Sequence, residues 1–237
     1  MEEEKQIELE TVGSKEEQIE TKKKGNAKKY LTIFFLFGFL CTTVSIVVTQ
    51  ITWDEIAKKI GASGLGYNIL VDFTRAAIIE EAFKFLGFYL AYIKFKFTKV
   101  KDFIIAAGIV GFVFGLVEKA VLFNIMPLIL GVIIPMHVLW QLNRGRHFYN
   151  FLEARKEGNK KRAFWQFFMA SVVIVLIHGT WDALLDLGEY FANKEEISYL
   201  GTIMYAIVII FGIFYIIYTI RKIIKAIAKA EDRVVEE

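Results

Sequence analysis

Ionisable side chains stand inside stretches of this sequence that are otherwise apolar. They are Glu80, Glu81 and Lys84 in a first stretch, Glu118 in a second, His137 in a third, and His178 with Asp182 in a fourth. A charge near the centre of a bilayer costs several kcal/mol, so such residues usually face a cavity and carry a function. Carboxylates and imidazoles move protons or hold metal ions, which indicates acid–base or metal-assisted chemistry.

The spacing of the first group places its charges on one helix face. Glu80 and Lys84 are four residues apart, and Glu81 and Lys84 are three apart, so all three side chains can meet on a helix. One lysine can therefore hold either carboxylate and keep at least one of them ionised in a medium of low dielectric constant. A purely structural charge cluster that ties helices together is the alternative for these residues.

Two further pairs repeat the four-residue spacing. His178 and Asp182 share a helix face, so Asp182 can accept a proton from one ring nitrogen and fix the tautomer. Phe114 and Glu118 also share a face, where we expect the ring to wall the carboxylate from lipid. His137 on its own could equally serve as a hydrogen-bond donor between helices.

The elements that must hold these residues are membrane helices. Of the 237 residues, 55% are apolar, which exceeds the roughly 45–50% of a soluble domain. A membrane helix needs about 20 mostly apolar residues. Six segments suit that role: 31–51, 67–93, 103–123, 126–142, 163–186 and 199–220. We therefore predict an all-α fold, a polytopic membrane helical bundle of about six transmembrane helices.

Basic residues gather in every second connection, which sets the orientation. The stretch before the first segment, the connections 94–101 and 143–162, and the stretch after residue 220 are rich in Lys and Arg. Cytoplasmic loops carry this excess, so both termini are predicted to be cytoplasmic in a protein of the cell membrane. The candidate residues then fall in one layer between the outer interface and the midplane. His147, inside the third basic stretch, is expected to be solvated.

The two ends of the chain lack a membrane-spanning pattern. Residues 1–29 are charged and have no apolar period, which predicts a disordered cytoplasmic tail. Residues 221–237 are predicted to be a cytoplasmic amphipathic tail, because isoleucines recur there at helical spacing among basic residues. The lone cysteine, Cys41, excludes a disulfide framework. Nothing in the sequence points to a nucleic-acid partner.

The order of the motifs resembles the PrsW family of intramembrane proteases, over roughly residues 70–185. The matching elements are Glu80-Glu81-x-x-Lys84, Phe114-x-x-x-Glu118, His137, and His178-x-x-x-Asp182, each on a successive membrane helix. The family is distantly similar to the CAAX-processing and bacteriocin-processing membrane proteases, which share paired glutamates and later histidines. This chain departs from the family pattern at two positions, with Lys119 in place of an asparagine and Gln141 in place of a threonine.

The resemblance implies that the membrane domain, 30–220, hydrolyses a peptide bond in a membrane-tethered protein such as an anti-sigma factor. Glu80 or Glu81 would be the general base that takes a proton from water. His137 and His178 would stabilise the oxyanion or protonate the leaving amine, and Glu118 would position the water or a histidine. Two histidines and a glutamate also match a zinc ligand set. Glutamate-type hydrolysis and hydrolysis with a divalent metal such as Zn therefore both stay open.

Two other functions use the same residue types. A proton- or ion-coupled transporter also places Glu, Lys and His near the midplane, and a non-catalytic membrane scaffold would use the polar cluster for packing. Because the predicted layer lies toward the outer side, we expect cleavage of an extracytoplasmic segment of the substrate. A CAAX-type role would need access from the cytoplasm.

Overall fold

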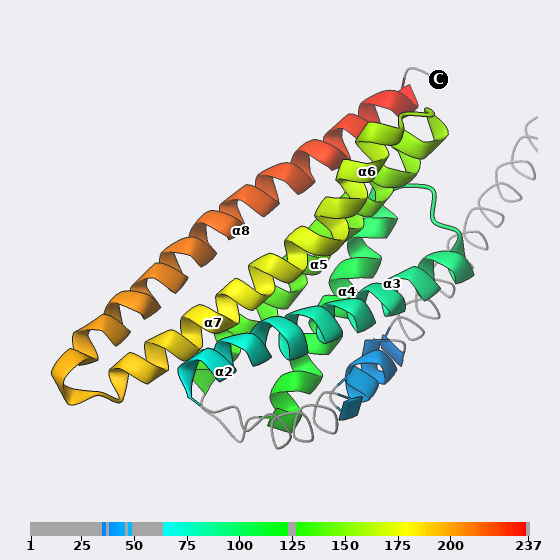
Figure 1. Cartoon of the computed structure of the whole chain (residues 1–237). Coiled ribbons are helices and arrows are strands. Elements are labelled where there is room, and N and C mark those ends of the chain that lie inside the picture. The colour runs from blue at the N-terminus through cyan, green and yellow to red at the C-terminus, as the bar shows by residue number, and fades with distance from the viewer. Residues whose placement is uncertain (1–34, 37, 46, 49–63, 123–126, 236–237) are drawn as a thin grey trace, which may run out of the picture.

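The computed structural model of the protein describes residues 35–36, 38–45, 47–48, 64–122 and 127–235. All regular secondary structure in these ranges is helical (Figure 1). After the helical residues between 35 and 48, the elements are α2 (Leu65–Val71), η1 (Asp72–Glu80), α3 (Glu81–Phe95), α4 (Val100–Leu122), α5 (Pro127–Lys156), α6 (Lys160–Phe168), η2 (Met169–Val173), α7 (Ile174–Ala192), η3 (Glu195–Ile197) and α8 (Ser198–Val235). The predicted all-α class is confirmed for this part of the chain.

The second predicted span, 67–93, is one continuous helical stretch made of α2, η1 and α3. The η1 segment is π-helical over nine residues and ends at Glu80. π-Helical turns are rare overall but occur often at functional sites, and this segment includes Glu80, the first of the paired glutamates. The stretch ends at Lys96, whose φ of 49° is left-handed, a conformation that favours glycine.

The connection predicted at 143–162 is wrong in its length, because α5 continues to Lys156 and only residues 157–159 lie outside helices. The predicted span 126–142 is the first part of this 30-residue helix. Polar residues beyond it continue the helix because they are buried against its neighbours. Asn143 donates hydrogen bonds to Tyr215 Oη at 2.9 Å and to Thr219 Oγ1 at 2.6 Å, both in α8. A satisfied amide of this kind is stable in a buried position.

His147 is half-buried between α5 and α6, so the expectation that it is solvated is wrong. Its Nδ1 donates to Gln166 Oε1 at 2.7 Å, and its Nε2 accepts from Arg146 Nη2 at 2.6 Å. Burial, together with the Arg146 charge, lowers the pKa of His147 to about 4. The ring is therefore neutral at pH 7.

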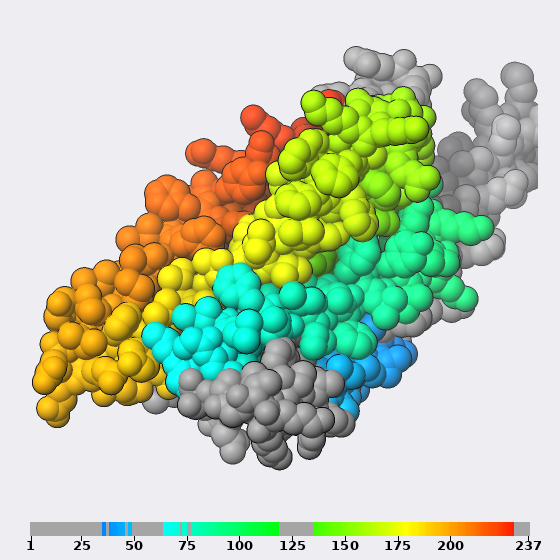
Figure 2. All heavy atoms as spheres, viewed as in Figure 1, coloured from blue at the N-terminus to red at the C-terminus, as the bar shows by residue number. Residues whose placement is uncertain are grey.

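The last two predicted spans form a long antiparallel pair. The helices α6, η2 and α7 run without a break from Lys160 to Ala192, and α8 runs back beside them (Figure 1). Helix α8 lies along one edge of the molecule (Figure 2). Many of its large apolar side chains are exposed. The predicted amphipathic tail, 221–237, is the end of this same helix as far as Val235, and its place on the inner leaflet stays a prediction.

Three helical segments in the described residues are long and apolar enough to cross a membrane: Val100–Glu118, Lys160–Ala192 and Glu195–Lys229. They indicate an integral membrane protein. The predicted span 31–51 lies only partly within the described residues, and the predicted tail 1–29 lies outside them entirely. The count of six crossings therefore stays a prediction.

Close approach of helix backbones brings the polar residues within reach of one another. Gly111 of α4 packs so tightly on α5 that a Cβ atom there would lie 2.5 Å from the carbonyl oxygen of His137. Gly179, which follows His178 in α7, packs on the Phe73 ring of η1, where a Cβ atom would lie 2.6 Å from a ring carbon. Small residues permit such packing between membrane helices.

Candidate active site

Glu81 anchors a buried polar cluster formed by η1, α3, α4, α5 and α7. Its side chain has no exposed surface, and four donors surround its two carboxylate oxygens. Lys84 Nζ lies 2.8 Å and His178 Nδ1 lies 3.0 Å from Oε1. Gln141 Nε2 and Arg144 Nη2 each lie 2.8 Å from Oε2. Hydrogen bonds that involve charged groups are strong, so these four donors hold Glu81 as a fixed carboxylate.

Lys84 is the central cation of the cluster. Besides its contact with Glu81, its Nζ lies 3.2 Å from Glu80 Oε2 and 3.0 Å from His137 Nδ1. The predicted link of one lysine to both paired glutamates is thus present. Phe114, which was expected to wall off Glu118, places its ring centroid 3.9 Å from this ammonium group. A cation–π contact stabilises the buried charge.

The two histidines of the cluster are neighbours, with ring centroids 5.2 Å apart. His137 Nε2 lies 2.7 Å from Glu118 Oε2, and His178 Nε2 lies 3.1 Å from Asp182 Oδ2, as the sequence spacing of the second pair predicts. Because an ammonium group only donates, His137 Nδ1 accepts from Lys84, so the neutral ring carries its proton on Nε2.

Glu80 is the less constrained carboxylate of the pair. The Glu80 side chain is 12% exposed. Within the described residues, its one hydrogen bond or ion pair shorter than 3.5 Å is with Lys84. One ligand atom from each of Glu80, His137 and His178 lies within 4.8 Å of the others. Two imidazoles and one carboxylate form the ligand set of many catalytic zinc sites, which keep a fourth position for water.

Carboxyl groups outnumber permanent cations in the cluster. The acidic residues are Glu80, Glu81, Glu118 and Asp182, and the permanent cations are Lys84 and Arg144. With every carboxyl group ionised and both histidines neutral, as metal ligands must be, four negative charges meet two positive charges, which leaves an excess of two. Unbalanced charge is costly in a low-dielectric site unless protons or a cation offset it. A divalent cation therefore fits both the donor set and the charge.

Gln141 and Arg144 contact Glu81, although the sequence did not predict them as site residues. Arg144 Nη1 donates to Gln141 Oε1 at 2.6 Å, and its Nε donates to the carbonyl oxygen of Ala170 in η2 at 3.0 Å. Helical spacing offered a signal for both, since they lie four and seven residues after His137 on one face of α5.

The five residues predicted to be catalytic all lie in this one cluster. They are Glu80, Glu81, Glu118, His137 and His178. Lys84 and Asp182, predicted to support them, lie within hydrogen-bond range of the same groups. The structure brings these side chains together, and the catalytic role of each stays a prediction.

The fold and the site define a class, an integral membrane protein whose helices hold paired glutamates and two histidines in one buried cluster. A family model described as PrsW family intramembrane metalloprotease matches residues 26–216. The chain therefore belongs to the PrsW family, as its motifs indicated. The protein named Protease PrsW from Clostridioides difficile (strain 630) is 29% identical over 167 residues, which are 66% of this chain and 67% of that protein. No solved structure matches the chain. Membership in this family supports an intramembrane protease.

Proposed function

We propose that the protein is an intramembrane endopeptidase in which Glu80 activates water, with His137 and His178 assisting. The unequal environment of the paired glutamates carries this proposal. Four donors hold Glu81, whereas Glu80 has one short contact and keeps partial exposure. A general base must be free to change its protonation state during the reaction. Glu80 suits that role, and Glu81 suits the role of a fixed anchor.

The positions of the side chains support a hydrolysis in the following steps. Glu80 takes a proton from a water molecule, whose oxygen attacks the carbonyl carbon of the scissile bond. To stabilise the oxyanion that forms, His137 and His178 would use their Nε2–H groups, which now lie beside Glu118 and Asp182 respectively. The C–N bond then breaks, and the proton passes to the leaving amine. Glu118, 2.7 Å from His137 Nε2, orients that ring.

A divalent metal fits the same site, where Glu80, His137 and His178 would hold it. When bound, it would polarise the substrate carbonyl and lower the pKa of a bound water. His137 would exchange one of its two partners, Lys84 or Glu118, to become a ligand. With Glu80 as a ligand, Glu118 is the nearby carboxylate that can accept a proton.

The membrane arrangement that we propose has six crossings, with both termini in the cytoplasm and the protein in the cell membrane. Basic residues in alternate connections support it. In this orientation the polar cluster lies between the midplane and the outer interface. The substrate is then a single-span membrane protein that is cut in its extracytoplasmic segment.

The test is to express the full chain and its Glu80→Gln variant in cells and to compare the new N-termini of membrane proteins by mass spectrometry. Glu189→Gln, the same change at an exposed position of α7, is the control. We expect cleavage with the wild type and the control, and about 10²–10⁴-fold less with Glu80→Gln, the usual contribution of a general base. Unchanged cleavage with Glu80→Gln would refute the proposed role. Ion flux into proteoliposomes with no cleavage would instead identify a transporter.

A further inference from the structure

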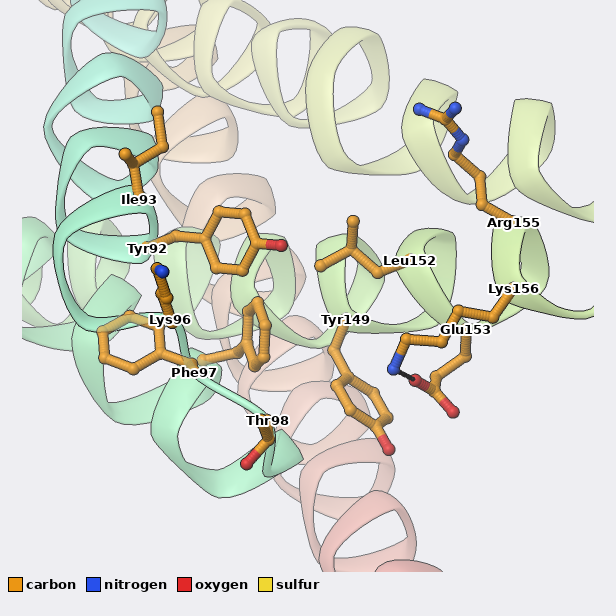
Figure 3. Close-up of a pocket in the computed structure, with 11 residues that line it drawn as sticks. Tyr92, Ile93, Lys96, Phe97, Thr98, Tyr149, Leu152, Glu153, Arg155 and Lys156 are labelled. Carbon is orange, nitrogen blue, oxygen red and sulfur yellow. Dashed lines mark hydrogen bonds and ion pairs between the residues drawn. The ribbon is translucent and has the colours of Figure 1, made fainter.

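A pocket of about 600 Å³ opens at the end of α3, and none of its lining residues belongs to the polar cluster. It lies between the connection from α3 to α4 and the C-terminal part of α5 (Figure 3). Its walls include the aromatic rings of Tyr92, Phe97 and Tyr149. The site is thus separate from the proposed chemistry.

Positive charge dominates the polar lining of this pocket. Lys96, Arg155 and Lys156 line it together with one carboxylate, that of Glu153. Lys156 Nζ lies 2.7 Å from Glu153 Oε1 and neutralises it, as the dashed line in Figure 3 shows. In the part of the chain that the structure describes, no carboxylate lies within ion-pair distance of Lys96 or Arg155. An anionic group is the ligand that complements this lining.

The left-handed backbone conformation of Lys96 is an independent sign that the lysine side chain has a function at this position. Its φ of 49° and ψ of 53° are left-handed, and glycine is the usual residue where a helix ends in this way. A Cβ atom disfavours this conformation. The chain nevertheless carries a lysine there, and its side chain lies beside Tyr92 and Phe97 in the pocket (Figure 3).

This end of the helices is the basic end, which the predicted orientation places at the inner leaflet. Anionic phospholipids concentrate there, and aromatic residues are enriched at that depth. We propose that the pocket binds an anionic phospholipid of the inner leaflet. The cationic side chains, Lys96 foremost, contact its phosphate, and the aromatic walls contact its glycerol and upper acyl region.

The experiment uses the full chain in lipid nanodiscs with photoactivatable phosphatidylglycerol or phosphatidylcholine, each with a diazirine near the glycerol. Mass spectrometry compares labelling of peptides 92–97 and 149–156 with labelling of the outward face of α8, which reports non-specific lipid contact. We expect phosphatidylglycerol to label the pocket peptides preferentially. Lys96→Gly should lower that labelling about fivefold, the effect of one basic residue near an anionic surface.

Two comparisons keep this proposal falsifiable. Lys96→Gly relieves the left-handed strain, so the variant should fold, and its elution in gel filtration checks this. Lys101→Ala removes an exposed charge at the same end of the molecule that does not line the pocket, and it should leave labelling unchanged. Equal labelling by both lipids, or an equal decrease in both variants, would overturn the proposal. So would cross-linking of the pocket to a protein in place of the lipid.

Discussion

Replacing Glu81 with glutamine should mainly lower stability, and replacing Glu80 with glutamine should mainly lower activity, because the two glutamates have different partners. Glu81→Gln removes the carboxylate that lies 2.8 Å from Arg144 Nη2, and the Arg144 side chain is only 1% exposed. The same change weakens the contact with Lys84. Glu80→Gln leaves both cations paired with Glu81. The first variant therefore strands a buried charge, and the second does not.

The expected difference follows from these contacts. Removing one partner of a buried ion pair typically costs about 3–5 kcal/mol, which we expect for Glu81→Gln. Glu80→Gln keeps an acceptor for Lys84 in the glutamine carbonyl, so its cost should be about 1 kcal/mol, the net value of one hydrogen bond. The two free energies of unfolding should thus differ by about 2–4 kcal/mol, or roughly 30- to 900-fold in the equilibrium constant.

Unfolding of the full chain in mixed micelles, titrated with SDS and followed by tryptophan fluorescence, measures both variants. The double variant Glu81→Gln/Arg144→Gln should recover part of the loss, since it removes the stranded charge. Equal destabilisation by the two single variants, or no recovery in the double variant, would refute the assignment of Glu81 as the fixed anchor of the cluster.

Three further predictions concern packing, pH and topology. Gly111→Ala should destabilise the protein by about 1–3 kcal/mol, because its Cβ would lie 2.5 Å from a backbone carbonyl oxygen. Gly66→Ala, whose Cβ would have nothing within 4 Å, should not destabilise it. The same SDS titration measures both variants. Burial lowers the pKa of His147 from 6.5 to about 4. As pH falls, His147 is therefore protonated in the unfolded chain before it is protonated in the folded chain. Stability should therefore drop by about 1 kcal/mol between pH 7 and pH 5.5, and His147→Gln should remove this part of the pH dependence. Cysteines placed at Lys156 and Glu195 should react with impermeant reagents from opposite sides of the membrane, and reaction from one side would contradict six crossings.

Contacts within one helix could be predicted from the sequence. The meeting of Glu80 and Glu81 with Lys84 depends only on the helical repeat, and so does the pairing of His178 with Asp182. Apolar length predicted where helices run, although their ends shifted where polar residues found buried partners. Local geometry and hydropathy thus carry most of what was predicted correctly.

Contacts between helices could not be predicted in this way. Arg144 follows an apolar segment in a stretch rich in Lys and Arg, so composition assigned it to a cytoplasmic connection. Its burial depends on Glu81 from α3 and on the carbonyl of Ala170 from η2, which are distant in the sequence. The π-helical segments η1 and η2 were likewise not predicted from the sequence. The choice between Glu80 and Glu81 as base depends on these same contacts.

The paired glutamates show how one short motif can supply two kinds of charge. Adjacent residues on a helix point about 100° apart, so the two carboxylates face different neighbours. Glu81 faces α5 and α7, whose donors fix it, while Glu80 lies where the ligand atoms of His137 and His178 converge. Lys84, three and four residues further along, reaches both. Because Glu81 keeps Lys84 paired whatever the state of its neighbour, Glu80 can accept a proton or bind a cation without leaving a buried positive charge alone.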